Sequence, residues 1–144
     1  MTNEKFGTYS HLLDRTSRRI KQFAQKRFKE AHFDITVDQW LILKHLDKDT
    51  HKNQSDLAEL TGKDHPTLTR IIDLLCKKGL TERRQHPTDR RSFLIALTAD
   101  GEEKMQKWSP LVADIRMKAW ENLGEKDYDD LKRILDTIYQ TLEI

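Results

Sequence analysis

The sequence predicts a mainly α-helical domain with one small β-hairpin, an α+β fold. Apolar residues recur at helical spacing over most of the 144 residues, and only the stretch after Gly79 changes to a strand-like pattern. Apolar residues make up 36% of the chain, which is enough for the core of one domain of this length.

The composition argues against several classes of protein. No apolar run approaches the roughly 18 residues of a membrane span, and the first residues lack the basic-then-apolar layout of a signal peptide. The single cysteine, Cys76, excludes an internal disulfide framework and a cysteine-based zinc cluster. We therefore expect a cytoplasmic protein that is not bound to a membrane and holds no cofactor or metal.

The net charge of +2 hides an uneven distribution. Residues 63–91 carry eight Lys or Arg against four Asp or Glu, whereas residues 98–144 carry seven against eleven. A local basic stretch is typical of a nucleic-acid site, and a solvated surface of mixed charge is the alternative.

Residues 1–33 predict one long helix with an apolar stripe. Little chain lies nearby in the sequence to cover this stripe, which indicates a partner subunit. The stripe consists of Tyr9, Leu12, Leu13, Ile20, Phe23, Phe28 and Ala31.

A second helix is expected after Thr36, because Thr36 and Gln39 have the residue types and spacing of a capping box. The three charged residues at 47–49 predict its end. We expect this helix to bury Val37, Trp40, Leu41, Leu43 and Leu46.

The next two helices are joined by a tight turn. Asn53 can cap the first, and Gly62 suits the left-handed residue at its end. Asp64 can cap the second, whose first turn tolerates Pro66, and Gly79 ends it. This arrangement predicts a helix-turn-helix. The expected apolar faces are Leu57, Ala58 and Leu60 on the first helix and Leu68, Ile71, Ile72, Leu75 and Cys76 on the second.

Residues 80–84 and 92–97 predict two short strands around a charged tip. Because an isolated hairpin is marginally stable, it must pack on the helix pair, and the two together form a winged helix. Thr98 then caps a helix to roughly Leu123, which Pro110 should kink or break. A last helix presents an apolar face of Tyr128, Leu131, Ile134, Leu135, Ile138 and Leu142.

The second helix of the pair carries polar residues near its N-terminal end, which is the end that enters a major groove. We expect Arg70 to contact a base edge or a phosphate, and the alternative is a surface ion pair with Asp73. The predicted contacts of this helix are His65, Thr67, Thr69 and Arg70.

The hairpin is rich in Arg, which suits a narrow minor groove because the potential there is strongly negative. Asp89 is expected to pair with Arg91 and fix its guanidinium group. A charged tip that only keeps the hairpin soluble is the alternative. The predicted wing residues are Arg83, Arg84, Asp89, Arg90 and Arg91.

Three segments resemble the MarR family of bacterial transcription regulators: Asp56 to Leu60, Thr67 to Leu80, and Asp89 to Gly101 with its Asp-x-Arg motif. The resemblance implies a homodimer that binds a palindromic operator in double-stranded DNA. It also implies that Asp89, Arg90 and Arg91 stabilise the wing and present Arg to the minor groove.

The resemblance implies one MarR-type domain over residues 1–144. Residues 34–98 would form its winged helix-turn-helix DNA-binding region, and residues 1–33 and 99–144 its helical dimerisation region.

The family's effector pocket lies between the dimerisation helices and the winged domain and takes small aromatic or phenolic anions. His11, Arg15, Trp40 and Trp108 can line such a pocket, with the Arg or His matching a carboxylate. The alternative is that the two Trp only pack in the core or in the dimer interface.

Two sensing mechanisms of the family are not expected. Its peroxide sensors use a reactive Cys near the start of the chain, whereas Cys76 lies on an apolar stripe. Its zinc-responsive members use clustered His, whereas the six His here are all more than four residues apart.

These patterns predict a homodimeric, sequence-specific DNA-binding repressor that a small effector releases. The alternative is a winged-helix module that binds another protein and has no specific DNA site. An enzyme is not expected, because the sequence has no Gly-rich phosphate loop, nucleophile elbow or metal-ligand spacing.

Overall fold

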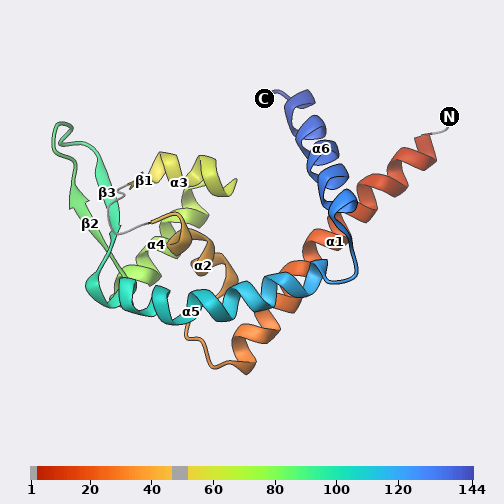
Figure 1. The fold of residues 1–144 in the computed structure, drawn as a ribbon. Helices are drawn as coiled ribbons and strands as arrows, with labels where there is room; N and C mark the ends of the chain where they lie inside the picture. Colours follow the sequence, from red (N-terminus) through yellow and green to blue (C-terminus); the bar gives the residue numbers. More distant parts are fainter. Residues whose placement is uncertain (1–2, 47–51) are drawn as a thin grey trace.

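The computed structural model describes residues 3–46 and 52–144, which form six α-helices, one short 3₁₀ helix and three strands (Figure 1). The predicted fold class, mainly helical with a small wing, is confirmed. In chain order the elements are α1 (Asn3–Glu30), α2 (Val37–Lys44), β1 (Lys52–Asn53), α3 (Gln54–Thr61), α4 (His65–Lys77), β2 (Thr81–Gln85), β3 (Phe93–Leu97), α5 (Ala99–Met117), η1 (Lys118–Trp120) and α6 (Glu125–Thr141).

Side-chain caps set the helix starts as the sequence predicts. The Thr36 hydroxyl accepts from the Gln39 amide at 3.1 Å, and the Gln39 side chain accepts from the Thr36 amide at 3.1 Å. Asn53 caps α3, and Asp64 caps α4 by accepting from the Thr67 amide at 2.8 Å. Each of these bonds satisfies an amide that has no partner inside its helix.

Glycines allow the chain to turn after α3 and α4. Gly62 has a φ of 70° and Gly79 a φ of 78°, both in the left-handed region that favours glycine. Gly101 is needed for another reason: a Cβ there would lie 2.1 Å from the carbonyl oxygen of Leu80. Close contact between α5 and the base of the wing therefore requires Gly101.

The wing is an antiparallel hairpin of β2 and β3, in which Thr81 pairs with Leu97 and Gln85 with Phe93. β1 pairs with the other edge of β3, so the sheet has the order β1-β3-β2. β1 could not be predicted from the sequence, because two residues are too few to show alternation. This strand joins the start of α3 to the wing.

The core lies where α2, α3 and α4 meet the sheet, the end of α1 and the first half of α5. α2 is surrounded by several elements, and Ile42 is therefore fully buried, whereas the predicted Leu41 is only half-buried. Leu60, predicted to be buried, is 51% exposed. The predicted end of α2 near residues 47–49 lies outside the described residues, and the helix itself ends at Lys44.

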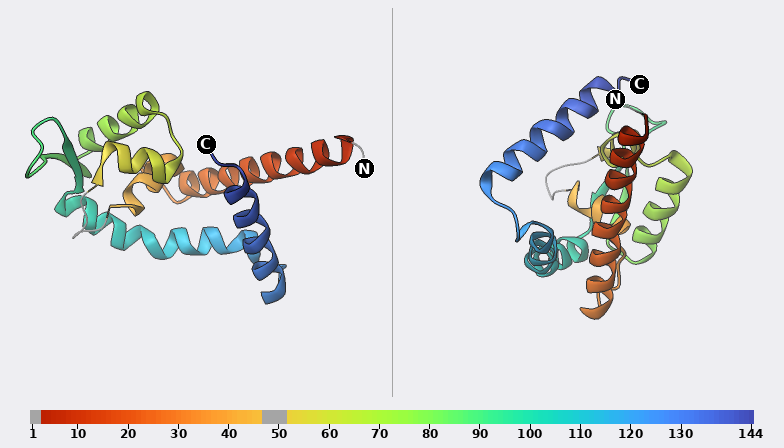
Figure 2. Two further views of the ribbon diagram at one scale, coloured as in Figure 1. Left: turned by 90° about the horizontal axis from the view of Figure 1, so that it is seen from above. Right: turned by 90° about the vertical axis from the view of Figure 1, so that its right-hand side faces the viewer.

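α1, α5 and α6 extend away from the winged core, and α6 stands at the far end of α5 (Figures 1 and 2). α5 continues through Pro110 to Met117, so the predicted break does not occur. The 3₁₀ helix η1 follows it directly, and the helical stretch therefore ends at Trp120, before the predicted Leu123. No helix among residues 3–46 and 52–144 has the length and apolar character of a membrane span.

Large apolar side chains on the extended helices stay exposed in the single chain. Within the described part of α6 no residue is buried, and its apolar face includes Ile134, Leu135 and Ile138 at 40–45% exposure. On α1, Tyr9, Leu12, Leu13 and Ile20 are exposed to a similar degree. Such faces are typical of surfaces that bind a partner.

Candidate nucleic-acid interface

α4 buries one face and leaves the opposite one accessible. Leu68, Ile71, Ile72 and Leu75 face the core, which fixes the orientation of the helix. The four residues predicted to contact DNA lie off this face: His65 and Arg70 are exposed, and Thr67 and Thr69 are half-buried.

The N-terminal turn of α4 is held by its own cap. The backbone and side-chain hydrogen bonds from Thr67 lower the pKa of the exposed Asp64 carboxyl below its ordinary value. A charged carboxylate at this position also interacts favourably with the helix dipole.

Thr69 is tied to α3. Its hydroxyl accepts a hydrogen bond from the side-chain amide of Gln54, the first residue of α3. Gln54 therefore lies beside the residues predicted to contact DNA. Nothing in the sequence singled it out, because a polar residue next to a helix cap is common.

Arg70 is exposed and makes no ion pair with the described residues. The alternative partner, Asp73, is occupied instead by the guanidinium group of Arg83 on β2. The Arg70 side chain is therefore available to a ligand outside the chain.

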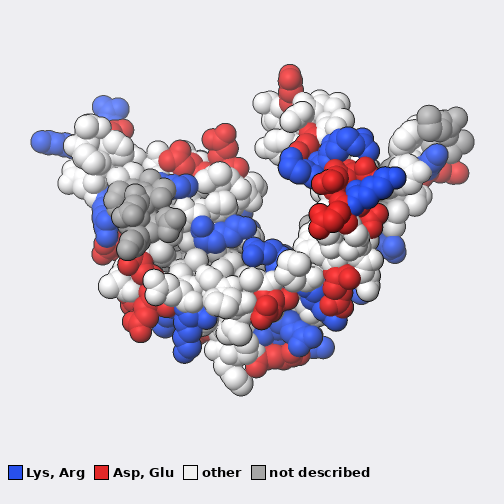
Figure 3. Space-filling model, viewed as in Figure 1, with Lys and Arg blue, Asp and Glu red and all other residues white. Residues whose placement is uncertain are grey.

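The wing arginines fall into two groups. Arg83 binds Asp73, and Arg84 binds Glu82 with its Nε at 2.8 Å from the carboxylate. Arg90 and Arg91 are exposed at the tip, and neither guanidinium group forms an ion pair within residues 3–46 and 52–144. Lys and Arg side chains project from the wing tip in Figure 3.

The tip is shaped by two polar side chains. Oδ1 of Asp89 accepts from the backbone amide of Arg91 at 3.0 Å. Nδ1 of His86 accepts from the amides of Thr88 and Asp89 at 3.2 and 3.1 Å. Asp89 thus holds the backbone of Arg91 rather than its guanidinium group, which corrects the predicted pairing, and the role of His86 was missed.

A groove of about 230 Å³ separates the start of α3 from the wing. Gln54 lines it from α3, and Arg83 and Arg91 line it from the wing. Residues from the helix-turn-helix and from the wing therefore converge on one concave surface.

The four residues predicted to line an effector pocket do not converge within the described chain. Trp40 and Trp108 are each 7% exposed and belong to the core, where Trp108 packs on Phe33 with ring centroids 5.3 Å apart. His11 and Arg15 are exposed on the part of α1 that extends beyond the core.

A different groove, of about 570 Å³, lies beside the C-terminal half of α1. Its lining includes the apolar residues Phe33 and Ile35 and the basic residues Lys26, Lys29 and Lys78. Gln22, Gln25, Asp34 and Thr36 complete the lining. A mixed lining of this kind suits a small anion with an apolar body.

Cys76 is half-buried at the end of α4. Its Sγ lies 3.3 Å from the hydroxyl of Thr81 and 3.9 Å from a guanidinium nitrogen of Arg83. These contacts place the thiol at the junction between α4 and β2.

Comparison with known proteins agrees with this architecture. The MarR family model matches residues 35–93. The HTH-type transcriptional regulator YhbI of Bacillus subtilis (strain 168), described as uncharacterized, is 30% identical over 139 residues, or 94% of this chain and 89% of that protein. The transcriptional repressor YetL of the same organism is 25% identical over 122 residues, or 85% of this chain and 70% of that protein.

A solved structure shows the same fold. The S. aureus MepR–DNA complex superimposes with a TM-score of 0.82 at 25% identity, covering 93% of this chain and 98% of that one. With the helix-turn-helix, the wing and the relatives in agreement, the chain belongs to the MarR family of winged-helix transcriptional regulators.

Proposed function

We propose that the protein is a homodimeric repressor that reads a palindromic operator in double-stranded DNA. The observation that carries the proposal is that Arg70 on α4 and Arg90 and Arg91 on the wing are exposed, with no ion-pair partner in the described chain. Arg70 would contact a base edge or phosphate in the major groove, and the wing arginines would enter the minor groove.

The other predicted contacts take supporting roles in this proposal. His65 and Thr67 lie in the first turn of α4, where they can reach bases or phosphates. Thr69, with Gln54, would contact DNA beside them. Arg83 would hold the wing against α4 through Asp73, and Arg84, which pairs with Glu82 on the same strand, would contribute positive charge near the phosphates.

Residues 34–98 would form the DNA-binding region, and residues 1–33 and 99–144 the dimerisation region. The exposed apolar faces of α1 and α6 support this division, because pairing two copies would remove both faces from water. A twofold dimer presents two α4 helices to two half-sites about 34–36 Å apart, one turn of DNA.

Repression is supported by the relative YetL, which is named as a transcriptional repressor. We propose that the protein acts in the bacterial cytoplasm, where its operator DNA lies. Binding of a small aromatic or phenolic anion would favour a dimer geometry with a different helix spacing and so release the DNA. The groove beside α1 supports an anionic effector because three lysines reach it.

A direct test selects fragments of the host genome on the purified protein at physiological salt and sequences them. We expect enrichment of a palindrome close to a small number of genes. Recovery of fragments with no shared sequence would contradict the proposal and favour the protein-binding alternative.

The effector is tested separately. Benzoate, the simplest aromatic carboxylate, should raise the melting temperature and release the selected DNA, whereas acetate should do neither. The Lys29→Gln variant should need more benzoate for the same release. Equal responses to benzoate and acetate would contradict an effector site for simple aromatic carboxylates.

A further inference from the structure

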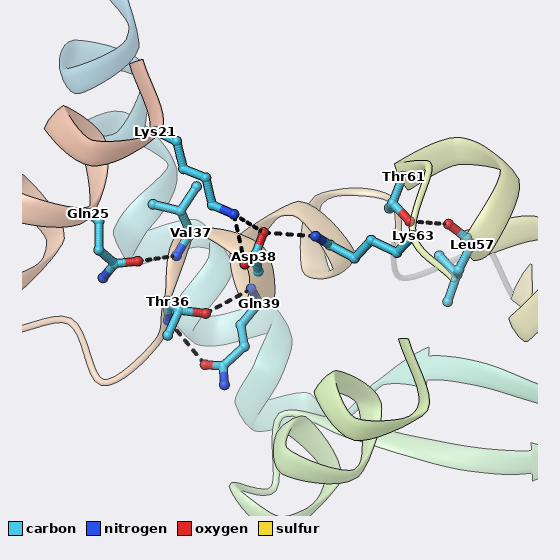
Figure 4. A network of polar contacts seen from close by, with 9 residues as sticks. All are labelled: Lys21, Gln25, Thr36, Val37, Asp38, Gln39, Leu57, Thr61 and Lys63. Atoms are coloured by element: carbon cyan, nitrogen blue, oxygen red, sulfur yellow. Dashed lines mark hydrogen bonds and ion pairs between the residues drawn. The ribbon is translucent and has the colours of Figure 1, made fainter. Parts of the chain in front are cut away.

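The N-terminus of α2 contacts α1 and the residues that flank α4. Figure 4 shows Asp38 and Gln39 in the first turn of α2, with side chains from α1 and from the turn before α4 directed toward them. These contacts join α1, in the proposed dimerisation region, to the proposed DNA-binding region.

Asp38 forms a bridge between α1 and the helix-turn-helix. Its Oδ1 lies 2.9 Å from Nζ of Lys21 on α1 and 2.9 Å from Nζ of Lys63. The Lys63 side chain is 17% exposed and that of Asp38 31%, so water screens this contact less than an ordinary surface pair. Burial raises the pKa of Asp38, but hydrogen bonds from Lys63 and Lys21 outweigh this and lower the pKa below 3.8.

Lys63 occupies the turn that orients the recognition helix. It follows the left-handed Gly62 and precedes Asp64, the cap of α4. A contact to Lys63 therefore acts on the backbone where α4 begins.

Gln39 contacts the C-terminal end of α4. Its side-chain oxygen accepts from Nζ of Lys78 at 2.9 Å, and the same Nζ donates to the carbonyl of Asp34. Lys78 directly follows the last residue of α4, and Gln39 is 5% exposed. Two adjacent residues of α2 thus hold both ends of the recognition helix.

α1 is joined to this point by a second contact. The Gln25 side-chain oxygen accepts from the Val37 amide at 2.9 Å, which satisfies an amide at the start of α2 (Figure 4). Together with Lys21, this contact fixes α2 against the helix that carries the exposed apolar stripe.

We propose that Asp38 and Gln39 are positioning residues that fix the direction of α4 relative to α1 and thereby set the half-site spacing that the dimer accepts. This inference rests on the proposed dimeric operator binding. A rigid connection within each protomer is required for the dimer to discriminate spacing, because α1 belongs to the proposed dimer interface and α4 to the DNA-contacting surface.

The test uses duplexes that carry the palindrome selected by the wild-type chain from random DNA, with the spacer lengthened or shortened by one or two base pairs. The wild-type protein should bind the original spacing at least about tenfold more tightly than the altered ones. Asp38→Asn should lose most of this preference, while its affinity for a duplex with one half-site stays within about twofold. Asp14→Asn is the matched control, since Asp14 pairs with Arg18 inside α1 itself, at 3.0 Å.

Three further variants separate positioning from a loss of folding. Asp38→Glu keeps the carboxylate and should restore the spacing preference. Lys21→Met should reproduce the effect of Asp38→Asn, and the double variant should add little to either single change. An unchanged spacing profile in Asp38→Asn would overturn the inference. A loss of affinity for the single half-site as large as the loss for the full palindrome would overturn it too. Failure of the wild-type chain to select any DNA would instead overturn the proposed function.

Discussion

Asp73 of α4 and Arg83 of β2 form an ion pair that joins the recognition helix to the wing. The pair has two consequences for the interface. It occupies the carboxylate of Asp73, with which Arg70 makes no ion pair, and it joins the first strand of the wing to α4. On the surface proposed to face DNA, Arg70, Arg90 and Arg91 are exposed and make no ion pair within the described residues.

The Arg83–Asp73 pair predicts that Arg83 supports DNA binding mainly by holding the wing against α4 and not by contacting DNA. Arg83→Ala and Asp73→Asn should then weaken binding to the selected operator by similar factors, because either change releases the wing. Each should lower the free energy of unfolding by no more than about 1 kcal/mol, as is usual for an exposed pair. Fluorescence anisotropy with labelled operator measures the first effect, and urea titration the second. A much larger binding loss in Arg83→Ala than in Asp73→Asn would show that Arg83 contacts DNA itself.

Arg91→Ala should weaken operator binding by about 1–3 kcal/mol, since the side chain is exposed at the tip and unpaired in the described chain. The dimer should remain intact in light scattering. Arg133→Ala, which removes an exposed Arg from α6, is the control and should bind DNA like the wild type. Unchanged affinity of Arg91→Ala in a gel-shift titration at moderate salt would remove the wing from the interface.

The apolar face of α6 predicts a dimer at micromolar concentration. Ile138→Glu should shift the protein toward monomer by at least about 2 kcal/mol, because the dimer would have to bury an unpaired carboxylate. Gln140→Glu adds the same charge at an exposed polar position and should leave the dimer unchanged. Light scattering of the three proteins distinguishes these cases, and a monomeric wild type would refute the dimer.

Asp38 predicts a specific dependence of stability on pH. Hydrogen bonds from two lysines lower the pKa of Asp38 in the folded chain below its ordinary value of 3.8. The charged carboxylate therefore stabilises the fold above about pH 3.8, and this stabilisation is lost as the pH falls through the lowered pKa. Urea midpoints of the wild type and Asp38→Asn should therefore differ more at pH 6 than at pH 3. An equal difference at both values would show that the charge of Asp38 does not stabilise the fold.

The sequence predicts those parts of the fold that depend on neighbouring residues. Thr36, Asp64 and Gly62 have roles that involve residues at most four positions away, so their side chains and spacing suffice. The apolar stripe of α4 was also predictable, because a helix repeats its buried face regularly.

Contacts between distant residues could not be predicted in the same way. Asp38 binds residues 17 and 25 positions away, and Gln39 binds one 39 positions away. The Asp73–Arg83 pair depends on how the wing folds back onto α4. Burial on α2 was predicted incorrectly at Leu41 and Ile42, because several elements surround that short helix and no single stripe describes it.

In the proposed function, a few placed residues give the protein sequence-specific DNA binding. The most direct test is the ratio of two dissociation constants at about 0.15 M salt, for the selected operator and for a scrambled duplex of equal length and composition. The wild type should bind the operator at least about 10³-fold more tightly than the scrambled duplex, and Arg70→Ala should lower this discrimination by about 1–3 kcal/mol. Dissociation constants within threefold of each other for the two duplexes would contradict sequence-specific binding.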